Sequence, residues 1–207
     1  MAALTTRAMA GAVRLEAVYR RRLEQVRPGR RELAWLARRY VARLVPGMRR
    51  LVRDAQRAGI EVRLVSGGIR QALLPLARKL GLAEDAVAAV AVRLDARGRY
   101  AGFDARSPLV RADGKRTLLE RLAAGRRQRT LLVGDGATDL AARPAVAAFC
   151  AFTAVVSRPA VVAGADHVAR RVADLITLLR LPGGATRRAA VKAGGGGRTA
   201  RRSGRRR

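Results

Sequence analysis

The 207-residue chain is poor in cysteine, aromatic residues and long apolar runs. Its single cysteine, Cys150, cannot form an intrachain disulfide, which is typical of a reducing compartment, so we expect a cytoplasmic protein. Cys150 lies in the apolar run AVAAFCAF, which predicts a buried, unreactive thiol. The longest apolar stretch, AVAAFCAFTAVV, is too short to cross a bilayer, and residues 1–15 lack the apolar segment of a secretory signal. We therefore expect no membrane partner.

Lysine is also scarce, although the formal net charge is +29. The only lysines are Lys79, Lys115 and Lys192, and arginine supplies the rest of the positive charge. Binding to phosphate backbones tolerates both residue types, so an almost lysine-free basic set indicates GC-rich coding rather than selection for nucleic acid. Aromatic residues are 3% of a chain that is 49% hydrophobic, which predicts a core of Ala, Val and Leu.

Three regions differ in pattern. Residues 1–45 show helical spacing in EAVYRRRLEQV and RELAWLARRYVARLV, separated by a Pro-Gly turn, and we interpret Trp35 and Tyr40 as helix-packing residues. Residues 46–181 alternate helix and strand patterns. Residues 182–207 are rich in Gly and Arg, contain no acid and have no apolar periodicity, which predicts a disordered basic tail.

The middle region predicts the fold class. Helices are expected in MRRLVRDAQRAG, IRQALLPLARKLGL, DGKRTLLERLAAG and VADLITLLRL, and Pro75 is expected to kink or shorten the second of these. Strands are expected in IEVRLVSGG, RTLLVGDG, PAVAAFCAF and ADHVAR, and two short strands around the turn at residues 97–98. Strands separated by helices predict an α/β protein with a mainly parallel sheet covered on both faces. Ligands then bind at the carboxyl ends of the strands.

Two polar features fall at such strand–helix junctions. In VSGGIR, Ser66 offers a hydroxyl, and Gly67 and Gly68 allow backbone N–H groups to approach an anion. Taken alone, this stretch is better explained as an ordinary glycine turn with a serine helix cap. In DGKRTLLERL, Lys115 occupies the first turn of a helix, where the helix dipole disfavours a cation, which favours a specific role. Taken alone, this is a weak signal, because a solvated surface lysine also explains it.

The third feature is LLVGDGATDL, in which an apolar strand runs into a tight turn. Asp135 and Asp139 then lie at the strand tip, where the first can ligate Mg²⁺ directly and the second can ligate it or hold its waters. A bound Mg²⁺ of this kind normally serves a phosphate. The order Ser-Gly-Gly, Lys and Gly-Asp-Gly-x-x-Asp is far more specific than any one of its parts.

These stretches carry a resemblance to a known family. Together with TRAMAGAV, LVPGMRRLV and RYAGFD, they resemble the haloacid dehalogenase (HAD) superfamily of phosphatases, and most closely its phosphoserine phosphatase family, over about residues 4–180. The resemblance implies a Rossmann-like parallel sheet, a small helical cap formed by residues 1–45, and a core formed by residues 46–181. The implied reaction is Mg²⁺-dependent hydrolysis of phosphoserine in serine biosynthesis.

By position, the resemblance also implies roles for individual residues. Phosphoryl binding is implied for Ser66, Gly67, Gly68 and Lys115, magnesium binding for Asp135 with support from Asp139, and a place in the same loop for Gly136 and Thr138. Substrate contacts in the cap are implied for Met9 and Arg22, with Arg22 pairing the serine carboxylate, and Arg158 falls near the rim of the site. Ala10 stands where the family usually has glycine, and Leu15 where it often has phenylalanine.

The family's first motif, Asp-x-Asp-x-Thr, has no counterpart in the sequence. No two of the nine aspartates are separated by one residue. In the family the first aspartate attacks phosphorus and the second transfers protons, and their strand lies between the strands expected here in IEVRLV and RTLLVG. We therefore expect an incomplete phosphatase that is inactive in this form, either because translation starts upstream or because the gene has lost its 5′ part.

Two alternatives remain open. The cap substitutions at Ala10 and Leu15 allow a HAD phosphatase acting on another small phosphomonoester. A catalytically dead, basic protein that binds a polyanion through its tail is the third interpretation, and weak nonspecific polyanion binding is expected at low salt in any case. The sequence does not predict the oligomeric state.

Overall fold

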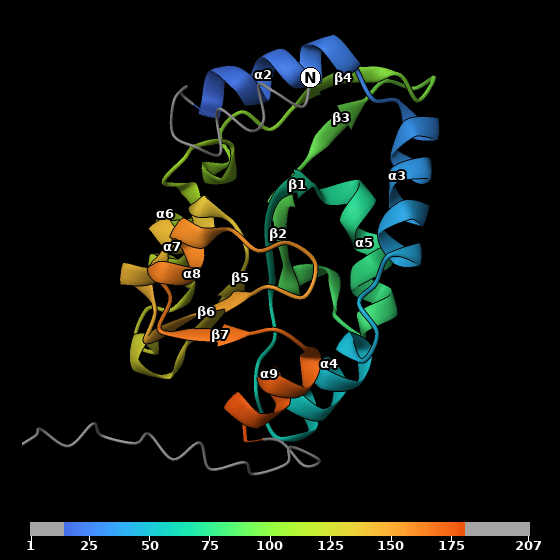
Figure 1. The fold of residues 1–207 in the computed structure, drawn as a ribbon. Helices are drawn as coiled ribbons and strands as arrows, with labels where there is room; N and C mark the ends of the chain where they lie inside the picture. The colour runs from blue at the N-terminus through green and yellow to red at the C-terminus, as the bar shows by residue number, and fades with distance from the viewer. Residues whose placement is uncertain (1–14, 181–207) are drawn as a thin grey trace, which may run out of the picture.

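The computed structural model describes residues 15–180, and side chains from residue 19 onward. Met9, Ala10 and the basic tail at 182–207 lie outside the described residues, and the expectations for them stay predictions. Helices and strands alternate as the sequence pattern predicts, and the α/β class is confirmed (Figure 1). No helix in this described part is long and apolar enough to cross a membrane.

The helices follow the apolar spacing of the sequence. They are α2 (Leu15–Val26), α3 (Arg30–Ala42), α4 (Met48–Arg57), α5 (Arg70–Leu80), α6 (Gly114–Leu122), α7 (Ala137–Ala141), α8 (Pro159–Ala163) and α9 (Val172–Leu178). Single 3₁₀ turns lie at Glu84–Ala86 (η1), Pro108–Val110 (η2), Arg127–Arg129 (η3) and Arg143–Ala145 (η4). Helix α5 continues through Pro75 without ending there. The short helices α7 and α8 were not predicted.

The strands form three small sheets within the described residues. Strand β1 (Leu64–Ile69) pairs in parallel with β2 (Val87–Val90), and β3 (Val92–Leu94) pairs antiparallel with β4 (Tyr100–Phe103). Strands β5 (Leu131–Gly134), β6 (Ala148–Phe152) and β7 (His167–Ala169) form a parallel sheet in that order. The expectation of two short strands around the turn at 97–98 is thus too simple, because residues 87–94 divide into two strands that join different sheets.

The facing edges of β1 and β5 carry no strand between them in the described chain. Strand β1 pairs only with β2, and β5 only with β6. The two strands nevertheless share a core, because Val65 of β1 packs against the cluster that contains Leu132 of β5 and Phe149 of β6. Val133 of β5 remains 39% exposed. Unpaired inner edges of this kind were expected from the missing Asp-x-Asp-x-Thr strand, because a buried strand edge needs a backbone partner.

The apolar core of the described residues divides into four clusters, one of which joins α2 and α3 to residues of the 46–181 region, so the expected boundary at residues 45–46 stays a prediction. Leu23 of α2 and Leu33 of α3 pack with Phe103 of the β3–β4 hairpin and with Leu109 of η2, at the upper end of the molecule (Figure 1). Below them, α4, α5 and α9 pack against the strands in two further apolar clusters. Another cluster packs α6, η4 and α8 against β5 and β6. Cys150 is fully buried, as expected, and burial raises the pKa of its thiol.

The interpretation of Trp35 is wrong. Its side chain is 55% exposed, because the packed face of α3 is formed by Leu33 and Ala37 instead. Tyr40 is half-buried and packs with the α4–α5 cluster, which agrees with the expected packing role.

Asp166, which directly precedes β7, accepts hydrogen bonds from η4 and from β6. Its carboxylate accepts hydrogen bonds from the Arg143 guanidinium (Nε, 2.9 Å) and from the Phe149 backbone N–H (2.9 Å). The Arg143 hydrogen bond is the main reason why the pKa of Asp166 lies far below its usual range. A carboxylate with a lowered folded-state pKa stabilises the fold above its unfolded pKa, and this stability is lost as the pH falls toward the folded value.

Replacing Asp166 by Asn is therefore expected to lower the free energy of unfolding at neutral pH. The difference from wild type should stay constant down to about pH 5 and shrink below about pH 4, near the unfolded pKa of an aspartate. Urea unfolding of both proteins at pH 7, 5 and 3 measures this. A difference that does not shrink between pH 5 and 3 contradicts the assignment.

Candidate active site

The Ser66–Gly68 turn is the irregular part of β1, where the pairing with β2 shifts between Ser66 and Ile69, and α5 begins directly after Ile69. Gly68 donates its backbone N–H to the Ser66 hydroxyl oxygen at 3.0 Å, so the hydroxyl is held against the turn. A side chain at Gly68 would approach that hydroxyl to 3.1 Å, which explains why the position suits glycine. Serine hydroxyl and glycine N–H groups are thus gathered at the carboxyl end of a parallel strand.

Turn η2 brings the Lys115 helix to the Ser66–Gly68 turn. A Cβ atom on Gly67 would lie 3.3 Å from the Leu109 carbonyl oxygen, and one on Gly114 would overlap the Pro108 carbonyl group. Both glycines therefore pack directly against η2, and only glycine fits at position 114. The first turn of α6, with Lys115, consequently lies at the same end of the sheets as the β1 turn.

Lys115 forms an ion pair with Asp139. The lysine side chain is 16% exposed and the aspartate side chain 8% exposed, so the pair is nearly buried. The second carboxylate oxygen of Asp139 accepts the backbone N–H of Gly136 at 2.9 Å. Gly134 lets Asp139 fold back over the strand end, because a Cβ atom there would overlap the carboxylate. With Asp139 packed against Gly134, both of its carboxylate oxygens have partners, and Lys115 is held at the carboxyl end of β5.

Asp135 is the exposed carboxylate of the pair at the strand tip. Arg158, which precedes α8, donates to the Asp135 backbone carbonyl at 2.7 Å and forms an ion pair with its carboxylate. Thr138 lies half-buried in α7 between the two aspartates. The resemblance thus placed Arg158 near the site, but the contact with Asp135 was not predicted, since the two residues are 23 positions apart.

The residues fit a magnesium ion through Asp135 alone. Mg²⁺ favours one or two carboxylates together with water and phosphate oxygens. The Asp135 carboxylate is exposed and can bind a metal ion in place of the Arg158 guanidinium. Both oxygens of Asp139 already accept hydrogen bonds, one from Lys115 and one from the Gly136 N–H. No group of three or more acidic, histidine or cysteine side chains suited to a metal occurs within residues 15–180. Asp139 is placed to orient Lys115, and its expected part in magnesium binding stays a prediction.

Tyr40 is a neighbour of the site that the sequence did not reveal. Its hydroxyl would lie 3.8 Å from a Cβ atom on Gly68, so α3 reaches the Ser66–Gly68 turn. Burial raises the pKa of this hydroxyl, which stays protonated and able to donate a hydrogen bond. Tyr40 lies in helix α3 and Ser66 in strand β1, with helix α4 between them in the sequence, so no local pattern connects the two residues.

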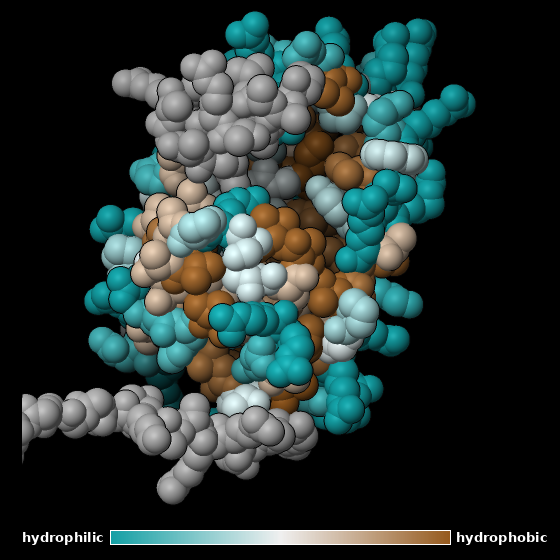
Figure 2. Space-filling model, in the orientation of Figure 1, coloured by the Kyte–Doolittle hydropathy of each residue, from teal (hydrophilic) through white to brown (hydrophobic). Residues whose placement is uncertain are grey.

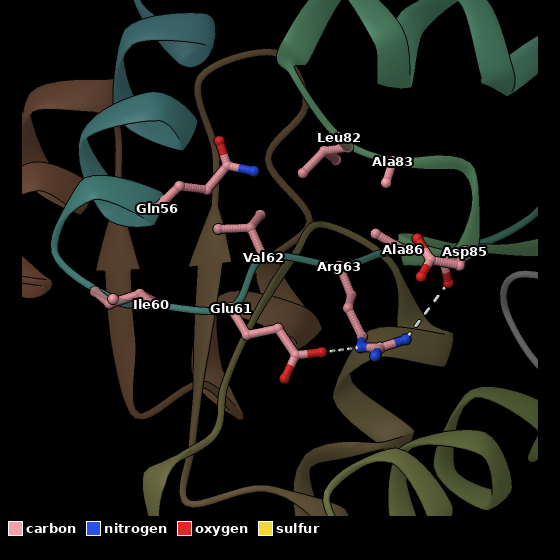
Figure 3. Close-up of a pocket in the computed structure, with 10 residues that line it drawn as sticks. Gln56, Ile60, Glu61, Val62, Arg63, Leu82, Ala83, Asp85 and Ala86 are labelled. Atoms are coloured by element: carbon pink, nitrogen blue, oxygen red, sulfur yellow. Dashed lines mark hydrogen bonds and ion pairs between the residues drawn. The ribbon is translucent and has the colours of Figure 1, made fainter.

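Arg22 lies on helix α2, and a separate pocket lies away from the Ser66–Gly68 turn. Arg22 is exposed on α2 and makes no ion pair within the described residues. A pocket of about 410 Å³ is lined by residues that precede β1 and β2, at the opposite ends of these strands from Ser66 (Figure 3). In this pocket Glu61 forms ion pairs with Arg63 and Arg126, and Arg63 donates to the backbone carbonyl of Asp85. The chemistry of phosphate binding is therefore concentrated at the carboxyl ends of β1 and β5.

Comparisons with known proteins agree with this geometry. A family model described as haloacid dehalogenase-like hydrolase matches residues 1–144. The human protein named phosphoserine phosphatase is 33% identical over 177 residues, covering 85% of this chain and 77% of its own length. The chloroplastic phosphoserine phosphatase of Arabidopsis thaliana is 34% identical over 178 residues, which are 84% of this chain but only 60% of that protein.

Solved structures show the same fold. A phosphoserine phosphohydrolase-like protein from Francisella tularensis superposes with a TM-score of 0.74 at 24% identity, covering 84% of this chain and 82% of the other. A substrate-bound phosphoserine phosphatase complex superposes with a TM-score of 0.69 at 22% identity and the same coverage.

Proposed function

Because the chain belongs to the haloacid dehalogenase-like hydrolase family, we propose that its site serves the Mg²⁺-dependent hydrolysis of O-phospho-L-serine to L-serine and phosphate. The observation that carries this proposal is the convergence of the Ser66–Gly68 turn and the Lys115–Asp139 pair at one end of two parallel strand pairs. Its named relatives are phosphoserine phosphatases. The lone, buried thiol of Cys150 supports a cytoplasmic setting.

In this proposal the residues of the site bind the phosphoryl group, position its ligands or hold the metal. The Ser66 hydroxyl and the Gly67 N–H donate to phosphoryl oxygens, the Gly68 N–H positions the Ser66 hydroxyl, and the Lys115 ammonium compensates the negative charge of the phosphoryl oxygens. Asp139 fixes the position of Lys115. Asp135 would hold Mg²⁺, which supplies further charge neutralisation when bound. Preorganised donors of this kind stabilise charge without the reorganisation that water would need.

The cap supplies substrate recognition in the same proposal. Residues 1–45 would cover the site, with Met9 and Arg22 facing the substrate and the Arg22 guanidinium pairing its carboxylate. The exposed guanidinium of Arg22 is compatible with that role. Arg158 would lie at the rim of the substrate site, because it donates a hydrogen bond to the Asp135 carbonyl oxygen.

The nucleophile is the missing element. The aspartyl-phosphate chemistry of the family needs an Asp-x-Asp-x-Thr motif, and the 207 residues contain no such spacing of aspartates. We therefore propose that this chain binds the phosphoryl group but does not attack it unless a strand carrying that motif occupies the place between β1 and β5.

Phosphate binding by the chain tests the site apart from turnover. Isothermal titration with O-phospho-L-serine and with inorganic phosphate, both with Mg²⁺, should show about tenfold tighter binding of the ester, because its carboxylate adds one charge-assisted contact. Lys115→Met and Ser66→Ala should weaken both ligands about tenfold or more. The matched controls are Lys79→Met and Ser157→Ala, which change exposed positions. Equal losses in controls and site variants would contradict the proposal.

A second prediction concerns Arg158. Replacing it by Gln removes the cation that pairs with the Asp135 carboxylate, so Mg²⁺ is expected to bind about two- to fivefold more tightly, in line with the small worth of exposed ion pairs. Titration of Mg²⁺ or Mn²⁺ by calorimetry measures the change. Arg143→Gln, which breaks an ion pair elsewhere, is the control and should leave metal affinity unchanged. An unchanged or weakened affinity in Arg158→Gln would show that Asp135 does not hold the metal.

A further inference from the structure

Trp35 is the one exposed aromatic side chain of this protein. All seven aromatic residues lie in the described part of the chain, and the other six are buried or half-buried. Trp35 is 55% exposed, on the side of α3 opposite Leu33 and Ala37. Helix α3 itself lies along the outer edge of the molecule (Figure 1). A large apolar ring in that position is available to a partner.

Arginines surround this ring. The Arg39 guanidinium lies 5.5 Å from the centroid of the Trp35 ring, within the range of a cation–π contact. Arg31 and Arg38 are exposed one turn before and one turn after Trp35, and the 1.5 Å rise per residue sets their Cα atoms about 10 Å apart along the helix. We call these four residues, Arg31, Trp35, Arg38 and Arg39, the Trp35 face. Figure 2 shows hydrophilic side chains projecting along this edge of the molecule.

The charges of the Trp35 face are not compensated locally. None of its three arginines forms an ion pair with the acidic residues that the structure describes. The one acid in α3, Glu32, accepts the backbone N–H of Gly29 at 2.9 Å. By contrast, the Arg50 and Arg53 side chains of α4 pair with Asp54. The Trp35 face therefore offers free cations beside an aromatic ring.

We propose that the Trp35 face binds single-stranded nucleic acid, with a base stacked on Trp35 and neighbouring phosphates held by the arginines. Every base has a flat π-face, so stacking on an aromatic side chain is tolerant of sequence, and basic side chains along the backbone supply the remaining affinity. The binding is separate from the proposed phosphatase site, because Trp35 lies on the outward side of α3 while Tyr40 of the same helix reaches the Ser66–Gly68 turn.

Other partners fit the face less well. Insertion into a membrane needs an apolar helix face, and that face of α3 is already buried in the protein. A second copy of the chain would bring like charges together, since the formal net charge is +29. Double-stranded nucleic acid keeps its bases stacked, so Trp35 would find no free base face. The arginine content of the chain alone would not distinguish these partners, but the exposed ring does.

The single tryptophan gives a direct reporter. Trp35 is the only tryptophan of the chain, so its fluorescence reports on the Trp35 face alone. The full chain is titrated with a roughly ten-nucleotide oligo(dT) and with an abasic oligonucleotide of the same length and charge. Oligo(dT) is expected to quench the fluorescence and to bind about fivefold or more tightly than the abasic strand. The basic residues at 182–207 attract both strands alike, so their contribution cancels in this comparison.

Variants then assign the affinity to residues. Anisotropy of a labelled oligo(dT) should show a loss of about fivefold or more for Trp35→Leu, with no loss for the abasic strand. Arg31→Gln/Arg38→Gln should lower the slope of log affinity against log salt by about 1.4. The matched control is Arg57→Gln/Arg97→Gln, which removes the same charge from exposed arginines without ion pairs elsewhere in the described chain.

Three results would overturn the proposal. Equal affinity for oligo(dT) and the abasic strand would mean that only charge attracts the polymer. Equal losses in the two double-arginine variants would mean that binding is spread over the whole surface. A blue shift of Trp35 with phosphatidylserine vesicles, without quenching by oligo(dT), would make the face a membrane contact instead.

Discussion

A fusion that adds an apolar strand ending in Asp-x-Asp-x-Thr ahead of residue 1 is expected to hydrolyse O-phospho-L-serine at least about 10⁴ times faster than the 207-residue chain. The expectation follows from the size of the loss when a covalent nucleophile is removed from an otherwise intact site. The groups that we propose to bind the phosphoryl group, Ser66 and Lys115, are held by contacts of the present chain, so the strand would add the attacking carboxylate and the proton-transfer group to them.

The structure indicates where such a strand would lie. Strands β1 and β5 belong to different parallel sheets, and Val65 and Leu132 belong to one apolar cluster although no described strand joins them. A strand that pairs with both would complete the backbone hydrogen bonds of both edges and cover Val133. Its carboxyl end would then emerge among Ser66, Lys115 and Asp135. Amide exchange of residues 64–69 and 131–134 is therefore expected to slow in the fusion protein.

Two control fusions separate chemistry from folding. Replacing the first aspartate of the added motif by Asn should abolish turnover while the slowed amide exchange persists. A proline in the middle of the added strand should abolish both, because it removes a backbone donor from a strand paired on both sides. The interpretation fails if the 207-residue chain already hydrolyses phosphoserine at the rate of the fusion, since the nucleophile would then be one of its own residues.

Residues whose roles depend on local backbone geometry could be predicted from the sequence. Ser66, Gly67 and Gly68 lie near the carboxyl end of β1, and Asp135 and Asp139 follow β5, so their common location results from the alternation of strands and helices. Cys150 was predicted to be buried because its neighbours are apolar on both sides along the strand. In these cases the sequence neighbours of a residue are also its main spatial constraint.

Features that depend on distant packing were not predicted. Trp35 was assigned to the helix interface because its segment has apolar residues at helical spacing, but Leu33 and Ala37 form the packed face and leave the ring exposed. The division of residues 87–94 into two strands arises because β2 pairs with β1 while β3 turns away to pair with β4. The contact between Arg158 and Asp135 joins two loops, and α7 spans only five residues, too few for a periodic signal.

Lys115→Met is expected to destabilise the protein by about 2–3 kcal/mol as well as to weaken phosphate binding. Removing one partner of a buried ion pair leaves an uncompensated charge, and the cost for such pairs is about 3–5 kcal/mol. We expect a loss below that range because the Lys115 side chain is 16% exposed, so water can reach the Asp139 carboxylate once the ammonium group is removed. Urea unfolding gives the free energy, and Lys79→Met, at an exposed position of α5, should change it by less than about 0.5 kcal/mol.

The double variant Lys115→Met/Asp139→Asn distinguishes the structural role of the pair from its role in binding. An asparagine at 139 carries no charge, and its carbonyl oxygen can still accept the Gly136 N–H, so most of the lost stability should return. Phosphate affinity should stay as low as in Lys115→Met, because no ammonium group faces the phosphoryl oxygens. A double variant that regains phosphate binding together with stability would show that Lys115 supports the fold only. One that regains neither would show that the Asp139 carboxylate has a further partner, such as the metal.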